Sequence, residues 1–478
     1  MASYMNSTLK CVMYIDDRIA GSPSSLQLTT KIRDVMLDDL QNAGFTVNFK
    51  KSNLTPSHRE VWLGFIVHTK KKMMLFVPKE KIDNILEKIE KCLEGELTTA
   101  RKISQIVGHL SSMSIAIGPL TRLFTKNMHV FIESSYSWDS LRLISFDLKA
   151  ELLFWRSNLY RCNGLSMTIN TQVNKIVYSD ASETGYGGYI VHIFDEIIAK
   201  GQFNPEEKGT SSTYRELLAV KHILESFKSH LKNQRVQWFS DNLNVTRIIN
   251  SGSTRNHLQT LALDIYNICF INNIILYPAW IPRELNKIAD KFSKEIDTDN
   301  WSIDNETFCY IQSIYGIFTV DRFSDDKNKK VKLFNSKYYC PRSGEINCFA
   351  FNWNNNFNWL CPPIYLIGKT IKHLRLCKGK GVLFIPLWKS AYFWPLLTTD
   401  GINFNSFVKH HLILDPYLMN FANLSDSVFD GFAKFYSLCF ITRFFITIVN
   451  CFYIIQNNKM MYQINLCLVL SCSCEVKC

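Results

Sequence analysis

Residues 174–294 carry the pattern that most restricts how this chain folds. A strand–turn–strand segment, "NKIVYSDASETGYGGYIVHIF", precedes one amphipathic helical segment, "STYRELLAVKHILESF". Two more strand-like segments, "RVQWFSDN" and "NNIILYPAWIP", are followed by a short helical one, "ELNKIADKFSK". Apolar residues recur at strand spacing in the first kind of segment and at helical spacing in the second. The region is therefore predicted to be a mixed α/β domain.

Four carboxylates occupy defined places in this pattern. Asp180 and Asp241 each close a strand, Glu216 lies in the first turn of the long helix, and Asp290 lies on the short helix. Strand ends are where side chains from separate segments converge. A site made of carboxylate oxygens alone suits Mg²⁺ or Mn²⁺. Two such ions can hold the attacking and leaving oxygens of a phosphodiester.

Each of these carboxylates also has an ordinary structural explanation. Glu216 completes Thr213-x-x-Glu216, which is the pattern of a helix capping box. Asp241-Asn242 could be a turn, and Asp290 could be a solvated helix residue. Taken singly, these explanations suffice. The four carboxylates together, each on its expected element and in this order, indicate a metal site more specifically than any one of them does alone.

The segments "VYSDASETGYGG", "TYRELLAV", "WFSDN" and "PRELNKIADKFSK" together resemble the ribonuclease H domain of retroelement polymerases. The resemblance implies that Asp180, Glu216, Asp241 and Asp290 are two-metal ligands and that the substrate is an RNA–DNA hybrid. That family often carries a histidine in the loop before the last aspartate. The matching place holds Trp280, ten residues before Asp290, so the auxiliary role of that histidine has no candidate here.

The segment "CVMYIDDRIAGS", residues 11–22, predicts a hairpin with two aspartates at its bend, and Asp-Asp is also an ordinary turn pair. "MYIDD" resembles the Y-x-D-D hairpin of a reverse transcriptase palm, which implies Tyr14 as a substrate-binding residue and Asp16 and Asp17 as metal ligands. "AGFTVNFKKSNL" resembles the next motif of that family, with Lys51 near the incoming phosphates, and "WLGFIV" resembles the primer-grip strand.

Polymerase chemistry in that family needs another metal-binding aspartate from an earlier palm strand, and fingers that close on the nucleotide. Only 15 residues precede Asp16. We therefore expect an N-terminally truncated reverse transcriptase with little or no polymerase activity. Strands are expected in "FTVNFKKSNL" and "EVWLGFIVHTKKKMMLFVP", a helix ending near Gly44, and mostly helix over residues 79–160.

The region after residue 301 resembles the segment that follows ribonuclease H in DIRS-like retroelements, which use a tyrosine recombinase. That segment in turn resembles a phage-type adenine-N6 methyltransferase. Cys361 and Ile364 flank Pro362-Pro363, where active enzymes hold an amide or carboxylate and an aromatic ring for the flipped base; Asp321 is retained. A degenerate Rossmann-like module is expected, and a hydrophobic domain with a Pro-Pro turn is the alternative.

Composition sets broader limits. The formal net charge of +12 favours a polyanionic partner, either nucleic acid or an anionic membrane. The 15 cysteines, most of them scattered singly, indicate reduced thiols, and "MASYMNSTLK" lacks the apolar core of a signal peptide, so a nuclear or cytoplasmic location is expected. Residues 435–455 are long enough to span a bilayer, but Arg443 and Asn450 make a membrane role an unfavoured expectation.

Together these observations predict a multi-domain α/β chain. The expected parts are a partial palm (1–75), a helical thumb and connection (76–165), a ribonuclease H-like mixed-sheet domain (166–298), a degenerate methyltransferase-like module (301–400) and an apolar, Cys-rich tail (401–478). Translation of decayed or intronic sequence is the favoured source of the tail. The expected function is a Mg²⁺- or Mn²⁺-dependent ribonuclease H. The alternatives are an inert nucleic-acid-binding remnant and a membrane-anchored fragment, and no protein partner is indicated.

Overall fold

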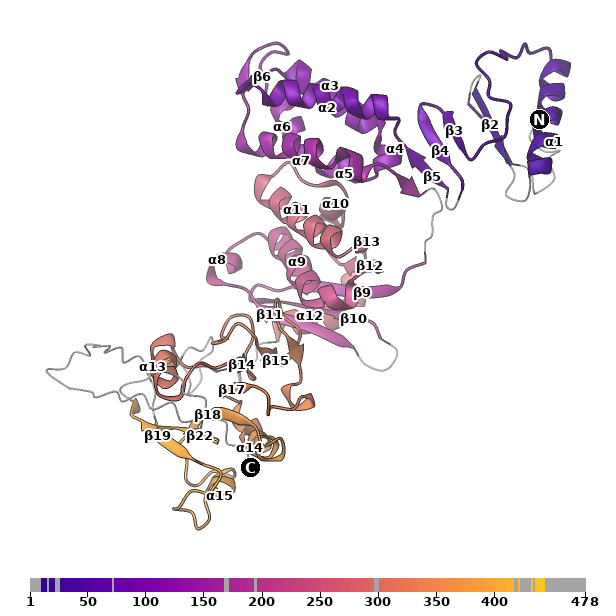
Figure 1. The fold of residues 1–478 in the computed structure, drawn as a ribbon. Coiled ribbons are helices and arrows are strands. Elements are labelled where there is room, and N and C mark those ends of the chain that lie inside the picture. Colours follow the sequence, from indigo (N-terminus) through magenta and orange to yellow (C-terminus); the bar gives the residue numbers. More distant parts are fainter. Residues whose placement is uncertain are drawn as a thin grey trace, which may run out of the picture.

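The computed structural model describes residues 10–14, 17–21, 26–70, 73–166, 172–192, 196–295, 301–416, 420–421, 431–432 and 435–442. Figure 1 shows an N-terminal hairpin and helix, a helical region, a central sheet domain and a second sheet domain at the far end. The central domain lies between the helical region and the second sheet domain.

The N-terminal part begins with the expected hairpin. Strand β1 (Lys10–Tyr14) pairs antiparallel with β2 (Asp17–Gly21), and Tyr14 lies opposite Asp17. Asp16, at the bend, lies outside the described residues. Helix α1 (Leu26–Asn42) ends two residues before Gly44, whose φ of +81° is the left-handed conformation that favours glycine after a helix.

The prediction of a strand in "FTVNFKKSNL" is wrong. Residues 45–54 contain no strand, because local hydrogen bonds fold the chain into a turn. The amides of Lys51 and Ser52 both donate to the Asn48 carbonyl at 3.1 Å, and the Asn48 side chain also accepts from the Lys51 amide. Such side-chain bonds of asparagine compete with strand pairing. The strands expected next are present as β3 (Arg59–Trp62), β4 (Phe65–His68) and β5 (Met74–Phe76).

The helical region matches its expected pattern. Its helices are α2 (Lys79–Leu93), α3 (Ala100–Ser112), α4 (Ser114–Ile117), α5 (Leu120–Leu123), α6 (Lys126–Glu133) and α7 (Phe146–Cys162). A small pair, β6 (Leu97–Thr98) and β7 (Arg142–Leu143), lies at one end, and β8 (Leu165–Ser166) returns to pair with β5. One face of α2 is buried, with Ile82, Ile85 and Ile89 in the core.

The central domain is built on a five-stranded sheet in the order β11-β10-β9-β12-β13. Its strands are β9 (Lys175–Ala181), β10 (Gly185–Ile190), β11 (Ile197–Gln202), β12 (Arg235–Ser240) and β13 (Ile275–Trp280). The first three pair antiparallel, whereas β9, β12 and β13 run parallel. The helices are α8 (Pro205–Lys208), α9 (Ser212–Leu231), α10 (Leu243–Ser251), α11 (Asn256–Ile271) and α12 (Lys287–Lys294), with the 3-10 turn η1 (Arg283–Leu285) before α12.

Two neighbouring glycines of β10 allow helices to pack closely on both faces of this sheet. A Cβ on Gly188 would lie 2.6 Å from the side chain of Ile223 in α9. A Cβ on Gly187 would lie 2.5 Å from the backbone nitrogen of Ser293 in α12. Successive residues of a strand point to opposite faces. Helices α9 and α12 therefore cover opposite faces of the sheet, and α12 is held close to its surface.

The second sheet domain extends past the expected boundary at residue 400. Its sheet has the order β14-β17-β18-β22-β19, formed by β14 (Val320–Asp321), β17 (Phe357–Leu360), β18 (Lys380–Pro386), β22 (Ser437–Ile441) and β19 (His410–Leu414). The first three strands are parallel, and β22 pairs antiparallel with both β18 and β19. Residues 437–441, expected in an apolar tail, are therefore a fully buried interior strand.

Shorter elements complete this domain: α13 (Asn305–Tyr315), β15 (Asn335–Ser336), β16 (Glu345–Ile346), η2 (Cys348–Ala350), η3 (Ile364–Leu366), α14 (Ile367–Leu376), α15 (Trp394–Leu397), β20 (Asn420–Phe421) and β21 (Gly431–Phe432). Across the described parts of the chain, no helix is both long and apolar enough to cross a membrane.

The second sheet domain contacts the central one along its edge strand β11. The Lys200 amide donates to the Tyr339 carbonyl at 3.0 Å, and the Tyr339 amide donates to the Ile198 carbonyl at 3.0 Å. The Tyr339 ring packs edge-on against Phe227 and His230 of α9. An edge strand offers unpaired backbone groups. This contact covers part of that edge with the chain's own downstream segment.

Candidate active site

The parallel pairing of β9 and β12 brings two of the predicted carboxylates together. Tyr178 pairs with Phe239, and continuing this register by two residues places Asp180 beside Asp241. Both lie at the carboxyl ends of their strands, as the sequence predicted. Asp180 is buried, and Asp241 is half-buried.

Glu216 joins this pair from helix α9. The capping-box explanation for Glu216 is wrong, because the helix begins two residues earlier than that pattern requires. Ser211 is the N-cap, and its hydroxyl accepts from the Tyr214 amide at 3.3 Å. Glu216 therefore lies in the second turn rather than the first, with its side chain buried.

Asp180, Glu216 and Asp241 form one cluster, since each offers a carboxylate oxygen within 4.8 Å of the others. Burial, followed by the nearby charges of Asp241 and Asp290, raises the pKa of Asp180 to about 6. Burial and the charges of Asp180 and Asp241 raise the pKa of Glu216 well above its usual range. Burial also raises the pKa of Asp241. Burial and mutual repulsion therefore oppose the ionisation of all three carboxyl groups at once.

The cluster fits a divalent cation. Glu216 Oε2 is buried without a hydrogen-bond partner, which is costly for a carboxylate oxygen. A hard cation would satisfy that oxygen and offset the mutual repulsion of the three groups. An all-oxygen donor set suits Mg²⁺ or Mn²⁺.

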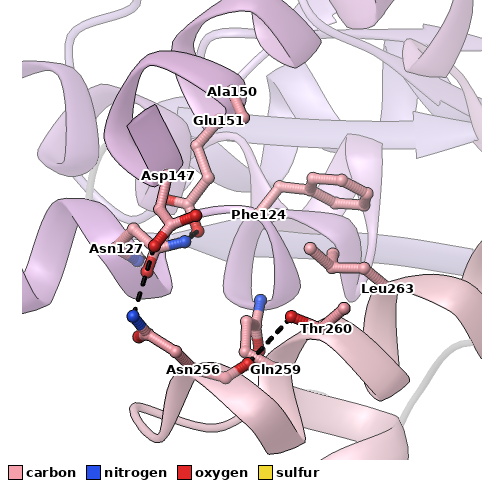
Figure 2. A pocket seen from close by; sticks show the side chains of 9 residues that line it. All are labelled: Phe124, Asn127, Asp147, Ala150, Glu151, Asn256, Gln259, Thr260 and Leu263. Carbon is pink, nitrogen blue, oxygen red and sulfur yellow. Dashed lines mark hydrogen bonds between the residues drawn. The ribbon is translucent and has the colours of Figure 1, made fainter. Parts of the chain in front are cut away.

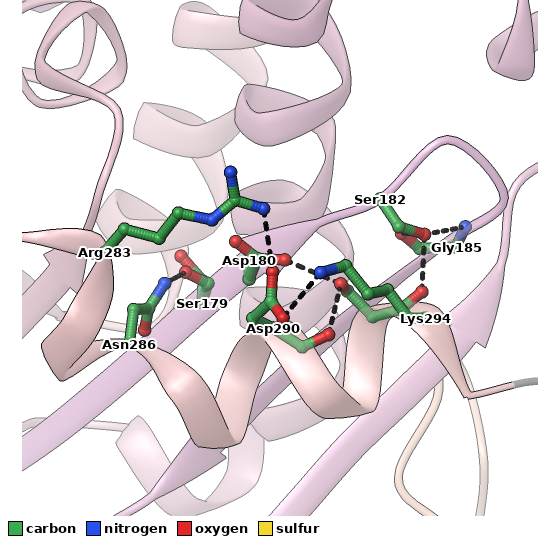
Figure 3. Close-up of polar contacts among 9 residues, drawn as sticks. Ser179, Asp180, Ser182, Gly185, Arg283, Asn286, Asp290 and Lys294 are labelled. Atoms are coloured by element: carbon green, nitrogen blue, oxygen red, sulfur yellow. Dashed lines mark hydrogen bonds and ion pairs between the residues drawn. The ribbon is translucent and has the colours of Figure 1, made fainter.

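Asp290, the fourth expected ligand, lies beside the cluster but is paired with cations. Its Oδ1 accepts from Arg283 Nη2 at 3.2 Å, and its Oδ2 accepts from Lys294 Nζ at 2.7 Å (Figure 3). Burial acts to raise the pKa of Asp290, but the hydrogen bonds from Lys294 and Arg283 outweigh it and lower that pKa. The structure therefore gathers three of the four predicted carboxylates and holds the fourth in ion pairs.

Two polar residues of the site were not predicted. The Ser293 hydroxyl donates to Asp180 Oδ2 at 2.6 Å, and the buried Asn286 side chain donates to the Ser179 carbonyl at 3.0 Å. Ser293 stands three residues after Asp290, and Asn286 four residues before it. Helical spacing puts both on the same side of α12 as Asp290. That spacing was the available indication in the sequence.

Trp280 occupies the place where the resembling family often has a histidine. Its indole N–H donates to the Asp241 carbonyl at 2.9 Å, while half of its surface remains exposed. An indole N–H is a donor only. Trp280 therefore orients the Asp241 backbone and cannot serve as a proton carrier.

The remaining predicted site residues lie elsewhere. Of Tyr14 and Asp17 the structure describes the backbone alone, and Lys51 is an exposed turn residue. In the second sheet domain, Asp321 ends β14 and is buried, and its carboxylate accepts from the amides of Lys330 and Phe323. Burial, then the charge of Asp321, raises the pKa of the Cys361 thiol well above its usual range.

A separate pocket of about 100 Å³ lies where the helical region meets α11 (Figure 2). On one wall, buried Glu151 accepts from the amides of Asn127 and Met128 at 2.9 and 3.0 Å. Burial raises the pKa of Glu151 to about 7. From the other side, Gln259 donates to the Leu123 carbonyl at 2.7 Å. The pocket is part of a polar contact that joins the helical region to the central domain.

Comparison with known proteins identifies the central domain. Residues 170–266 match the family model described as "RNase H-like domain found in reverse transcriptase". The central domain is an RNase H-like domain of the reverse transcriptase type. The match includes Asp180, Glu216 and Asp241 and ends before Asp290. A search of curated proteins found no match for the chain.

Solved structures similar to this chain include a foamy viral protease-reverse transcriptase in complex with double-stranded DNA. The identity is 17%, the match covers 56% of this chain and 46% of that one, and the TM-score is 0.30. The chain thus spans less than half the length of that relative. LC11-RNase H1 in complex with an RNA/DNA hybrid is 19% identical over 25% of this chain and 93% of its own, with a TM-score of 0.22. RNase H1 from Halobacterium salinarum is 15% identical over 25% of this chain and 92% of its own, with a TM-score of 0.21.

Proposed function

We propose that the central domain is a divalent-metal-dependent ribonuclease H that cuts the RNA strand of RNA–DNA hybrids. The observation that carries the proposal is the cluster of Asp180, Glu216 and Asp241 at the carboxyl ends of β9 and β12, with Glu216 Oε2 buried and unpartnered. The match to the RNase H-like family over these residues supports it. The net charge of +12 supports a polyanionic substrate.

The three clustered carboxylates would hold the metal, with Asp290 as a further ligand. Bound there, the metal would activate a water nucleophile and stabilise the leaving oxygen of a phosphodiester. Ser293 holds the Asp180 carboxylate by its 2.6 Å hydrogen bond, and Trp280 fixes the backbone at Asp241. Recognition of the RNA strand would rest on its 2′-hydroxyl groups.

The test is cleavage of a 5′-labelled RNA–DNA hybrid by the full chain in Mg²⁺ or Mn²⁺. Asp180→Asn removes a ligand charge at nearly constant volume and is expected to lower the rate on the order of a thousandfold. Asp264→Asn is the matched control, because Asp264 pairs with Lys221 away from the cluster. Hybrid binding without cleavage in either metal would instead support the inert nucleic-acid-binding remnant.

For the flanking parts, we propose a reverse transcriptase palm hairpin at residues 10–21, a thumb-type helical region, and a degenerate adenine-methyltransferase-like module of DIRS-like type after residue 301. The antiparallel pairing of Tyr14 with Asp17 supports the hairpin. The parallel β14, β17 and β18 support a Rossmann-like module, and the burial of Asp321 and Cys361 supports its lack of activity. Incubation with labelled S-adenosylmethionine and adenine-containing DNA is expected to give no transfer, and transfer above a no-protein control would contradict this.

A further inference from the structure

The ion pairs of Asp290 come from two different kinds of place. Lys294 is four residues further along α12, which is an ordinary pairing on a helix surface. Arg283 comes from η1, the turn that connects β13 to α12. The side chains of Arg283 and Lys294 are 70% and 53% exposed, whereas that of Asp290 is 22% exposed. Both cations therefore reach the carboxylate from the solvent side.

The charges of the carboxylate cluster also act on Arg283. The hydrogen bond and charge of Asp290, and then the charges of Asp241 and Asp180, raise the pKa of the Arg283 guanidinium. The four carboxylates thus share the site with the two cations paired to Asp290 and with Arg215, whose charge acts on Glu216, and this leaves an excess of negative charge. Solvent-exposed ion pairs are weak. A divalent cation bound by the cluster would therefore displace the Arg283–Asp290 pair readily.

We propose that Arg283 is a positioning residue with two alternative partners. Before cation binding, it holds the Asp290 carboxylate. When a divalent cation occupies the cluster, Asp290 turns to the cation, and the released guanidinium binds a phosphodiester oxygen of the nucleic-acid strand. The planar fork of a guanidinium matches phosphate as well as carboxylate. This inference rests on the proposed function. It makes Arg283 a positive group at the rim of the site, where the neighbouring Trp280 carries no charge.

The first test is a calorimetric titration of the full chain with Mn²⁺ in the absence of nucleic acid. Arg283→Gln removes a competitor for Asp290 and is expected to bind Mn²⁺ roughly two- to fivefold more tightly than the wild type. Lys291→Gln removes the same charge from an exposed position of α12 and is expected to leave the affinity unchanged. Arg283→Lys keeps the positive charge, and its Mn²⁺ affinity is expected to lie between those of the wild type and Arg283→Gln.

The second test measures hybrid affinity by stopped-flow fluorescence anisotropy before turnover, in Mn²⁺ and in EDTA. Arg283→Gln is expected to weaken binding roughly three- to tenfold in Mn²⁺ and to change it little in EDTA, where Arg283 remains paired with Asp290. Lys291→Gln is expected to show no such difference between the two conditions.

Equal Mn²⁺ affinities of Arg283→Gln and Lys291→Gln, or an equal loss of hybrid affinity in Mn²⁺ and EDTA, would overturn the exchange. Absence of Mn²⁺ binding in every variant would overturn it as well. Neither test depends on cleavage. If both give the expected results while no RNA is cut, the exchange stands and the proposed ribonuclease function fails.

Discussion

The Ser293 hydroxyl lies 2.6 Å from Asp180 Oδ2 and donates a hydrogen bond to it. This bond links α12 to β9 across 113 residues of sequence. Ser293 is buried against Gly187, whose missing side chain lets the helix approach the sheet. The position of the short helix thus controls the ionisation of a carboxylate that is central to the candidate metal site.

Ser293→Ala should shift the pH dependence of hybrid cleavage and should affect the maximal cleavage rate much less. The hydrogen bond from Ser293 favours ionised Asp180, so its loss raises the pKa of Asp180 further above about 6. Since the ionised group binds the metal, the acid limb of the pH–rate profile should move to higher pH by roughly half to one unit. Rates at pH 8.5 should agree with the wild type within about threefold. An equal loss at every pH would contradict this role.

Asp180→Asn should stabilise the metal-free chain at neutral pH. The folded-state pKa of about 6 lies above the ordinary value of 3.8, so the folded state keeps a proton that the unfolded state releases between those values. Stability from this group is therefore present at low pH and is lost as the pH rises towards 6. The variant should gain roughly 1–3 kcal/mol over the wild type at pH 7.5, and less below pH 5.

Chemical denaturation in EDTA at several pH values checks this difference. Added Mg²⁺ should reverse this difference in stability. The cation stabilises the folded wild type, whereas the variant lacks one of the carboxylates that would bind it. A pH-independent difference between the two proteins would count against the raised pKa.

Gly187→Ala should destabilise the central domain by roughly 1–3 kcal/mol, because the new Cβ would lie 2.5 Å from the Ser293 backbone nitrogen. Hybrid cleavage should fall with it, since α12 carries Ser293 and Asp290. Gly209→Ala is the control: no atom lies within 4 Å of its added Cβ, and its φ of −74° suits alanine. Denaturation midpoints of the two variants decide the comparison, and equal midpoints would be the contrary result.

Tyr339→Ala should loosen the contact between the second sheet domain and β11. It removes a ring packed on Phe227 and His230, at a cost of roughly 1–3 kcal/mol. The amide of Lys200, which donates to the Tyr339 carbonyl, should exchange with deuterium faster. Tyr136→Ala, at a fully exposed tyrosine, should leave both stability and exchange unchanged. Unchanged Lys200 exchange in Tyr339→Ala would show that the contact does not protect this edge.

The sequence by itself identified most local elements and three members of the cluster. Helix α2 and strands β9 and β12 follow from apolar periodicity, which local backbone geometry imposes over a few residues. Asp180 and Asp241 were recognisable because each closes such a strand. The strand expected at residues 45–54 failed because Asn48 hydrogen-bonds its neighbours, a competition that apolar spacing does not reveal.

Tertiary structure alone decided how the charged groups are paired. Three features depend on how separate segments pack. They are the parallel register that places Asp241 beside Asp180, the buried Glu216 oxygen without a hydrogen-bond partner, and the ion pair between Arg283 and Asp290. Likewise β22 enters the second sheet from far along the chain, so a boundary read from composition near residue 400 divided one sheet. Periodicity reports an element's own geometry, whereas charge pairing and strand order depend on distances between elements that only the packed core fixes.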